Sequence, residues 1–435
     1  MSKPNTTNGK ARKILFAILA IALAVVCFFG GFLVNALTLD SEMRSLMRLK
    51  NTVQAQYYEE ITDEEFYDAV FAGINEKLLD PYSKYMTADE FAQLQSEAAG
   101  NRSGLGVVFL VENAAGDAQM LVTRVCGNSP AEKAGIKAGE YLVGFGINQS
   151  EMQKSVDFEE FSAFLAERKT DEPFYLRVQS GEGERIVEIA KAEFVENYVF
   201  YRTNTTAYRF TGNNATTLVE SGEPLPLLPE DTAYIRLTQF NGEAAEEFKK
   251  AMNLFKEQGK TNLVLDLRDN GGGYLHIMQS IASYFCKTSK ENRPIVAIAD
   301  YGERKENYRA DGNYYDEYFS AESRVCVLAD SSTASASEAL MGCMLDYGAI
   351  SYGDICLSER AGEAKTYGKG IMQTTFPFGL INCDAVKLTT AKILWGASQN
   401  CIHGRGIVEA DGTKSVTENY VGDNEINAAI AKLFF

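Results

Sequence analysis

From Ala233 onwards, short apolar segments alternate with helical patterns, and this alternation restricts the fold more than any other feature of the sequence. The segments AYIRLTQF, NLVLDLR and RVCVLAD begin at residues 233, 262 and 324, and a helical pattern follows each of them. A continuous apolar strand is typical of a parallel sheet that helices cover on both faces. We therefore expect residues 233–435 to form a mostly parallel α/β core.

The residues before this core divide into three regions. Residues 38–99 contain two helix starts, Thr62-Asp-Glu-Glu65 and Thr87-Ala-Asp-Glu90, which have the spacing of capping boxes and predict a small helical region. Residues 100–191 change to short β-rich runs with one amphipathic helix, which predicts a β domain. Residues 192–232 are polar and then rich in proline, and we interpret them as a connecting or arm segment.

An uncharged segment near the N-terminus predicts a membrane anchor. Residues 14–34 read ILFAILAIALAVVCFFGGFLV, twenty-one residues without a charge, close to the length that spans a bilayer's hydrocarbon core. We expect a single-pass anchor in the cell membrane over residues 14–37, a basic cytoplasmic tip over residues 1–13, and all later residues outside the cytoplasm. A cleaved signal peptide is the alternative, but the run is long for one and Val34-Asn-Ala36 is a poor cleavage site.

Charge, cysteine and histidine content exclude several classes of function. The formal net charge is −17, from 42 basic and 59 acidic residues, so we expect no binding to nucleic acid. Of the eight cysteines, Cys27 lies in the apolar segment and the others are irregularly spaced without a C-x-x-C pair, which indicates neither a zinc site nor a disulfide framework. The two histidines, His276 and His403, lie outside any H-E-x-x-H motif, which argues against a metallopeptidase.

A candidate nucleophile lies in VCVLADSSTASASEAL, from Val325, which predicts a strand, a turn of small residues and then a helix. This geometry presents Ser335 at a helix N-terminus, where small neighbours leave room for a substrate backbone and the helix dipole favours an oxyanion. In the alternative, Ser331-Ser-Thr333 is only a turn and one serine is an N-cap. A nucleophilic serine here would need a base other than histidine, because neither histidine lies in a recognisable base motif.

A candidate base lies in TYGKGIMQ, from Thr366. Lys369 is flanked by glycines, so it can approach a neighbouring backbone closely, and burial would favour its neutral form, which can accept a serine proton. Gln373 could then orient the amine. Four residues join two side chains directly on a helical turn but span about 13 Å along a straight strand, and the sequence leaves this geometry open. In the alternative, the Gly-Lys-Gly motif is a surface turn.

A glycine-rich turn, DLRDNGGG from Asp266, closes the second apolar strand. In an open α/β sheet, ligands bind in the crevice at the carboxyl ends of the strands, where this turn should lie. A phosphate-binding turn is the alternative, but a P-loop lysine is missing and two aspartates would repel phosphate. The backbone N–H of Gly272, paired with that of Ala336, would suit an oxyanion hole.

In this order, seven segments resemble the C-terminal processing peptidases, also called tail-specific proteases, from about Tyr82 to Leu433. They are DPYSKYMTADEF, SGLGVVF, SPAEKAGIKAGEYL, LVLDLRDNGGG, TASASEAL, YGKGIMQ and HGRGI. The resemblance implies a ClpP/crotonase-like α/β core with Ser335 as nucleophile, Lys369 as general base and Gln373 as the amide that orients the lysine. It implies neither a cofactor nor a metal.

The resemblance also implies that residues 100–191 are a PDZ domain. In such a domain the loop Gly104-Leu105-Gly106-Val107 would donate backbone N–H groups to a C-terminal carboxylate, while the bound peptide adds a β strand. The expected activity is that of a serine-type endopeptidase that cleaves protein substrates at or near their C-terminal tails through an acyl-enzyme. A catalytically silent PDZ scaffold that captures C-termini is the alternative, and a homo-oligomer stays open.

Two departures from the family pattern concern the surroundings of the site. The interval of 34 residues between Ser335 and Lys369 is longer than is usual, with extra material near residues 357–365, which predicts an enlarged loop. Residues 407–411 lack the proline that such proteins commonly carry. Neither departure removes a catalytic group, so we expect an active enzyme.

Overall fold

The computed structural model describes residues 22–23, 25–27, 40–114, 117–153, 157–211, 215, 217–220, 222–287, 292–312, 314–360, 362–417 and 423–434. The chain divides into two compact units, Met1–Asp80 and Pro81–Phe435. The first unit contains the helices α2 (Ser41–Gln56) and α3 (Asp63–Lys77). The capping box predicted at the start of α3 is confirmed, because the side chains of Thr62 and Glu65 each accept a hydrogen bond from the other residue's backbone N–H.

The predicted anchor, residues 14–37, falls outside the described residues except at 22–23 and 25–27. Within the part of the chain that the structure describes, no helix has both the length and the apolar character that crossing a bilayer requires.

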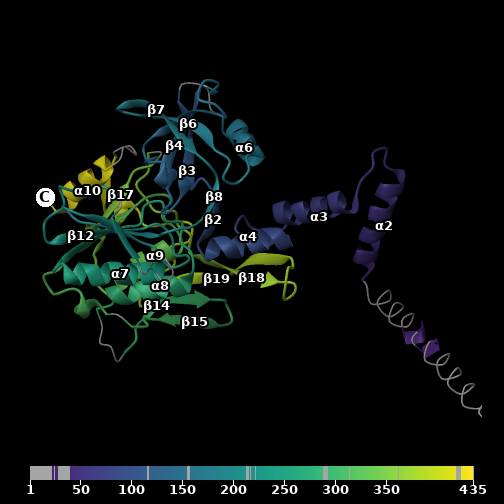
Figure 1. The fold of residues 1–435 in the computed structure, drawn as a ribbon. Coiled ribbons are helices and arrows are strands. Elements are labelled where there is room, and N and C mark those ends of the chain that lie inside the picture. Colours follow the sequence, from purple (N-terminus) through teal and green to yellow (C-terminus); the bar gives the residue numbers. More distant parts are fainter. Residues whose placement is uncertain are drawn as a thin grey trace, which may run out of the picture. The chain divides into compact units, whose positions relative to one another are not determined.

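An eight-stranded sheet lies at the centre of the second unit (Figure 1). Its strands, in the order in which they pair, are β11 (Thr217–Glu220), β10 (Ala207–Thr211), β9 (Val199–Arg202), β12 (Thr232–Leu237), β13 (Asn262–Asp266), β16 (Val325–Ala329), β17 (Ile355–Ser358) and β20 (Lys414–Val416). The strands from β12 to β20 are parallel, as the apolar sequences of β12, β13 and β16 predict, whereas β9, β10 and β11 are antiparallel. Residues 192–232 therefore contribute three strands to this sheet rather than only a connection.

Helices cover both faces of the eight-stranded sheet, with α7 (Ala244–Glu257), α8 (Leu275–Ala282) and α9 (Ala336–Asp346) on one face and α10 (Asn424–Phe434) on the other (Figure 1). Neighbouring residues of β12 explain this arrangement, because successive side chains of a strand point to opposite faces. Ile235 belongs to the core cluster that contains Phe248 of α7. Tyr234 belongs to the cluster that contains Ile430 of α10.

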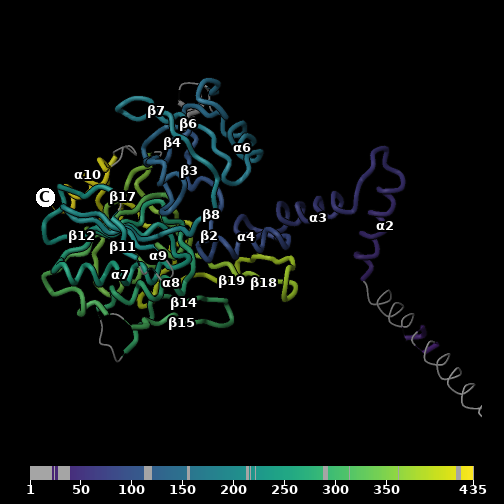
Figure 2. Tube along the Cα trace, viewed as in Figure 1, coloured from purple at the N-terminus to yellow at the C-terminus, as the bar shows by residue number. Residues whose placement is uncertain are grey.

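A second sheet has five strands, namely β1 (Lys84–Met86), β19 (Ala385–Trp395), β14 (Ile295–Asp300), β15 (Lys305–Arg309) and β18 (Ile371–Pro377), of which β18 pairs with β19. Strand β1 pairs with β19, so that Lys84 lies opposite Lys387. Figure 2 shows the start of the second unit beside this much later strand. The sheet therefore brings the segment around Tyr82 to the residues that follow Lys369.

The β region between these segments forms a sheet of five strands in the order β3 (Val107–Ala114), β4 (Asp117–Val125), β5 (Tyr141–Gly146), β6 (Phe174–Ser180) and β7 (Gly183–Ile189), with the helices α5 (Pro130–Lys133) and α6 (Phe158–Glu167). Phe161 of α6 packs in its core with Phe145 and Phe174. Strand β3 lies at the edge of the sheet.

A two-stranded ribbon, β2 (Asn101–Gly104) and β8 (Ala192–Val195), carries the chain into and out of this sheet. The helix α4 (Ala88–Ala98) precedes the ribbon, and the capping box predicted at Thr87 is confirmed. Short 3-10 helices are η2 (Ser283–Phe285), η3 (Tyr315–Glu317), η4 (Tyr352–Asp354) and η5 (Glu409–Asp411).

Candidate active site

Ser335 is the N-cap of α9, directly after the turn that follows β16. Its backbone has φ +60° and ψ −115°, a region that residues other than glycine seldom adopt. The side chain is half-buried, whereas the following residues of α9 are buried against the sheet. The backbone N–H of Ser335 donates to the Glu338 carboxylate at 3.0 Å, which holds the strained residue at the start of the helix.

The Glu338 carboxylate joins the Ser335 turn to the loop that carries Lys369. It is 1% exposed and accepts hydrogen bonds from the backbone N–H groups of Ser335, Gly368 and Lys369 and from the Thr366 hydroxyl. Ser335 N and Lys369 N bind the same oxygen, Oε2, at 3.0 and 2.9 Å, so the two nitrogens are at most 5.9 Å apart. Burial raises the pKa of Glu338, while the four hydrogen bonds favour its ionised form.

Lys369 is half-buried in this loop. Its backbone neighbour Gly368 has φ +87°, and a Cβ on Gly370 would lie 2.8 Å from the backbone nitrogen of His403, so both positions require glycine. The Nζ atom lies over the ring of Tyr82, 5.0 Å from the ring centroid. The Tyr82 hydroxyl in turn donates to the Tyr367 hydroxyl at 3.3 Å.

Gln373 lies on β18, next to an irregularity of the β18–β19 pairing between Met372 and Gln373. The residues from Lys369 to Gln373 are therefore part loop and part strand. Neither the helical turn nor the straight strand that the sequence leaves open describes them fully. The Gln373 amide donates to the Thr389 hydroxyl at 3.2 Å. Thr389 also donates its backbone N–H to the Ser83 hydroxyl at 2.9 Å, so Gln373 borders the same segment as Tyr82.

The glycine-rich turn lies directly against the Ser335 turn. Gly272 has φ +102°, and a Cβ there would lie 2.8 Å from Ser335 Cβ and 3.0 Å from Ala336 N. The Gly272 N–H donates to the Asn270 side chain at 3.0 Å, so this expected oxyanion donor already has an acceptor. The N–H of Ala336 has no acceptor among the described residues, as is usual at the first position of a helix.

The Gly104–Val107 loop enters the edge strand β3. The carbonyl of Leu105 accepts the Ala131 N–H at 3.0 Å and that of Gly106 accepts the Cys126 N–H at 2.8 Å. Gly106 has φ +74°, and a Cβ there would lie 2.2 Å from Ser129 Cβ. The loop is thus fixed through its carbonyl groups, at a position that only glycine can occupy.

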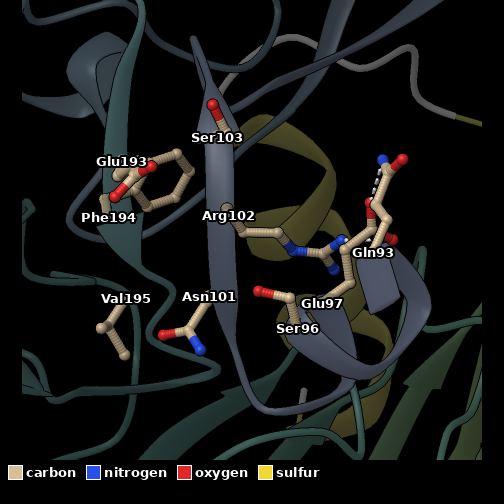
Figure 3. Close-up of a pocket in the computed structure, with 9 residues that line it drawn as sticks. All are labelled: Gln93, Ser96, Glu97, Asn101, Arg102, Ser103, Glu193, Phe194 and Val195. Atoms are coloured by element: carbon tan, nitrogen blue, oxygen red, sulfur yellow. Dashed lines mark hydrogen bonds and ion pairs between the residues drawn. The ribbon is translucent and has the colours of Figure 1, made fainter. Parts of the chain in front are cut away.

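A polar pocket of about 650 Å³ lies beside the ribbon that leads into this loop (Figure 3). Residues of α4, β2 and β8 line it, among them Glu97, Arg102 and Glu193. Arg102 donates to Glu196 at 2.8 Å and to Gln239 at 3.1 Å, which joins the ribbon to the α/β core.

Three further residues at the site are not predicted by the sequence patterns. Glu338 follows Ser335 at the S-x-x-E spacing of a capping box, a signal that predicts a local cap but not the contact with Gly368 and Lys369. Asn270 lies inside the glycine-rich turn, and Tyr82 lies in the first segment that resembles the family. Among the described residues no group of three His, Cys, Asp or Glu side chains could hold a metal ion.

Comparisons with known proteins identify the family that this chain resembles. Residues 231–411 match the model of peptidase family S41. The "Probable CtpA-like serine protease" of Staphylococcus haemolyticus is 26% identical over 416 residues, which are 93% of this chain and 73% of that protein. The "Carboxy-terminal processing protease CtpB" of Bacillus subtilis is 24% identical, over 85% of this chain and 67% of that protein. The crystal structure of a "Putative S41 protease" from Bacteroides fragilis has the same fold, with a TM-score of 0.51 at 15% identity, over 86% of this chain and 90% of that one.

Proposed function

Because this chain belongs to the C-terminal processing peptidases and is a serine-type peptidase, we propose that Ser335 and Lys369 are its nucleophile and general base. The observation that carries the proposal is the buried Glu338 carboxylate, whose Oε2 binds the backbone N–H of both residues. The backbone nitrogens of the two residues are at most 5.9 Å apart, and lysine has a flexible four-carbon stem, so we expect its amine to reach the serine hydroxyl.

The proposed reaction is acyl transfer. Neutral Lys369 takes the Ser335 hydroxyl proton while Oγ attacks the peptide carbonyl carbon, and the lysine then gives this proton to the leaving amine. Water, activated by the same amine, releases the acyl group from Ser335. Gln373 orients the lysine, and the N–H groups of Gly272 and Ala336 bind the oxyanion once Gly272 has turned away from Asn270.

The β domain, residues 100–191, is proposed to be a PDZ domain that captures the C-terminal tail of a protein substrate. Among the strands that the structure describes, the edge strand β3 pairs only with β4, so a peptide can add along its other side as a further strand. The carbonyls of Leu105 and Gly106 accept hydrogen bonds from the N–H groups of Ala131 and Cys126, which fix the loop in place. This arrangement supports the proposal that the N–H groups of the loop donate to a terminal carboxylate. We expect a tailed substrate with an amidated C-terminus to lose at least about tenfold in kcat/KM compared with the free acid.

We further propose that residues 14–37 anchor the protein in the cell membrane with the peptidase outside the cytoplasm. The support is the uncharged run of twenty-one residues and the basic tip before it. Extraction of membranes at alkaline pH should leave the protein in the membrane fraction. Release into the soluble fraction would contradict the anchor without affecting the catalytic proposal.

Substitution of the two reactive residues tests the catalytic proposal. Ser335→Ala and Lys369→Ala should each reduce peptide cleavage by at least about 10³-fold, while circular dichroism and thermal unfolding stay as in the wild type. The control variant is Lys365→Ala. It removes a lysine of the same loop, one that pairs with Glu363, and should leave cleavage unchanged. Wild-type cleavage by either active-site variant would refute the assignment. The alternative, a catalytically silent PDZ scaffold, would be favoured by two results together. The wild-type protein would bind C-terminal tails tightly, and an active-site serine probe would not label its Ser335.

A further inference from the structure

The aromatic ring of Tyr82 has a defined relation to the proposed base. The Lys369 Nζ atom lies 5.0 Å from the ring centroid, within the distance of about 6 Å over which an aromatic face attracts a cation. The hydroxyl at the far end of the ring donates to the Tyr367 hydroxyl at 3.3 Å. Tyr367 lies two residues before Lys369, so the loop contacts Tyr82 at both the ring face and the ring edge.

The segment that carries Tyr82 is tied to the strand beside the site. The Ser83 hydroxyl accepts the Thr389 N–H at 2.9 Å, and the next three residues form β1, which pairs with β19. The Tyr85 hydroxyl donates to Asp384 at 2.6 Å. Since Thr389 also binds the Gln373 amide, the segment of Tyr82 and Gln373 belong to one continuous hydrogen-bonded structure.

An aromatic face attracts an ammonium group but not a neutral amine, because the attraction comes from the ring quadrupole acting on a charge. Lys369 is neutral before it takes the Ser335 proton and is an ammonium afterwards. We propose that Tyr82 is a positioning residue whose ring face holds the Lys369 ammonium that forms when Ser335 is deprotonated. The proposal rests on the assignment of Ser335 and Lys369 above.

Two effects of opposite direction follow for the pH profile. The ring stabilises the ammonium in the transition state, which raises the activity plateau. It also stabilises the ammonium of the resting enzyme, so a higher pH is needed before the amine becomes a base. Loss of the ring should therefore lower the plateau and also move the acid limb of the profile to lower pH.

Other titratable groups surround this loop and enter the design of the test. The Glu338 carboxylate of α9 binds the Lys369 backbone N–H, and the Tyr367 hydroxyl meets that of Tyr82. From the loop after β19, the Cys401 thiol donates to the Gly370 carbonyl at 3.6 Å and the His403 backbone packs against Gly370. A variant at His403 therefore serves as a control for this neighbouring imidazole.

The experiment measures kcat/KM of the full chain between pH 5 and 10 on one peptide substrate. Tyr82→Leu should lower the plateau about 5-fold to 30-fold and move the midpoint of the acid limb down by about half to one pH unit. Tyr82→Phe keeps the ring face and should retain both values. Phe378→Leu, which alters an exposed aromatic residue of the neighbouring hairpin, and His403→Asn should leave the midpoint in place.

Ring fluorination nearly keeps the shape of the side chain, so a loss of activity does not come from altered packing or folding. Phenylalanines of increasing fluorine content at position 82 should lower the plateau and the midpoint stepwise, because fluorine weakens the quadrupole. Two results would overturn the proposal and leave Tyr82 a structural role. One is a lower kcat/KM plateau with an unchanged midpoint of the acid limb. The other is an equal loss of kcat/KM in Tyr82→Leu and Tyr82→Phe. Cleavage by Ser335→Ala or Lys369→Ala would instead overturn the assignment on which it rests.

Discussion

At the scale of single residues, the Glu338 carboxylate joins the backbone of Ser335 to that of Lys369, the proposed nucleophile and base. Its two carboxylate oxygens each accept two hydrogen bonds, whereas a glutamine has one carbonyl oxygen and would turn an NH₂ group toward N–H donors. Glu338→Gln should therefore reduce kcat/KM about 100-fold and destabilise the fold by about 1.5–3 kcal/mol. Steady-state kinetics measures the change in kcat/KM, and urea unfolding measures the change in stability. The control is Glu363→Gln, which changes an exposed glutamate. Retained activity would show that the two loops hold their places without the carboxylate.

Gly272 offers a second test at this scale, because its neighbour is a matched control. An alanine at Gly272 would place Cβ 2.8 Å from Ser335 Cβ at φ +102°, whereas nothing lies within 4 Å of a Cβ on Gly271. Gly272→Ala should lower kcat about 10²-fold to 10³-fold, whereas Gly271→Ala should change kcat little. Equal kinetics for the two variants would mean that the turn does not contribute to oxyanion binding.

The residue types at the site could be predicted, but their contacts could not. A serine at a helix start and a lysine between glycines suit acyl transfer, which points to Ser335 and Lys369, and these roles stay predictions. Glu338 binds Thr366, Gly368 and Lys369 across 28 to 31 positions of the chain, and no local pattern predicts such a contact. The bond between Gly272 and Asn270 depends on a rotamer inside the turn, which the sequence does not specify.

At the scale of elements, α7 makes its contact with the start of β9 through a buried carboxyl group. Glu247 accepts hydrogen bonds from the N–H groups of Tyr198 and Val199, yet burial raises its pKa to about 8. A folded-state pKa above the ordinary value of 4.5 means that stability is fully present below about pH 4.5 and is lost as the pH rises toward 8.

Glu247→Gln keeps the acceptor and removes the titration. The thermal unfolding midpoint of the wild type should therefore fall more steeply between pH 5 and 8 than that of Glu247→Gln, and scans at several pH values measure the difference. Glu257→Gln, at an exposed position of the same helix, should follow the wild type. Parallel profiles for all three proteins would show that Glu247 does not titrate in this range.

Elements with a clear apolar pattern could be predicted, and the others could not. Strands β12, β13 and β16 are buried along nearly their whole length, so their sequences are continuous apolar runs. Strand β15 reads KENYR and is largely exposed, which makes it indistinguishable from a polar loop. The second sheet also depends on the pairing of β1 with β19, and partners so distant in the chain leave no local signal.

At the scale of the whole molecule, buried ion pairs tie the C-terminal helix to the strands beneath the site. Glu425 at the start of α10 binds both Arg268 and Arg360, and Arg268 also pairs with Asp266. Although burial favours the protonated acid, Arg268 lowers the pKa of Asp266 to about 2. This part of the stability is present above the ordinary aspartate value and is lost as the pH falls toward 2.

Glu425→Ala should leave two guanidinium groups buried without this partner. Breaking one side of a buried pair costs about 3–5 kcal/mol, which urea unfolding should detect, whereas Glu409→Ala removes an exposed carboxylate of η5 and should cost less than about 1 kcal/mol. Arg360 also pairs with Asp330, which begins the turn before Ser335. Cleavage should therefore fall together with stability, since the network that holds α10 also contacts the turn before Ser335, the proposed nucleophile. Full activity in a destabilised Glu425→Ala protein would separate the two and confine the network to a structural role.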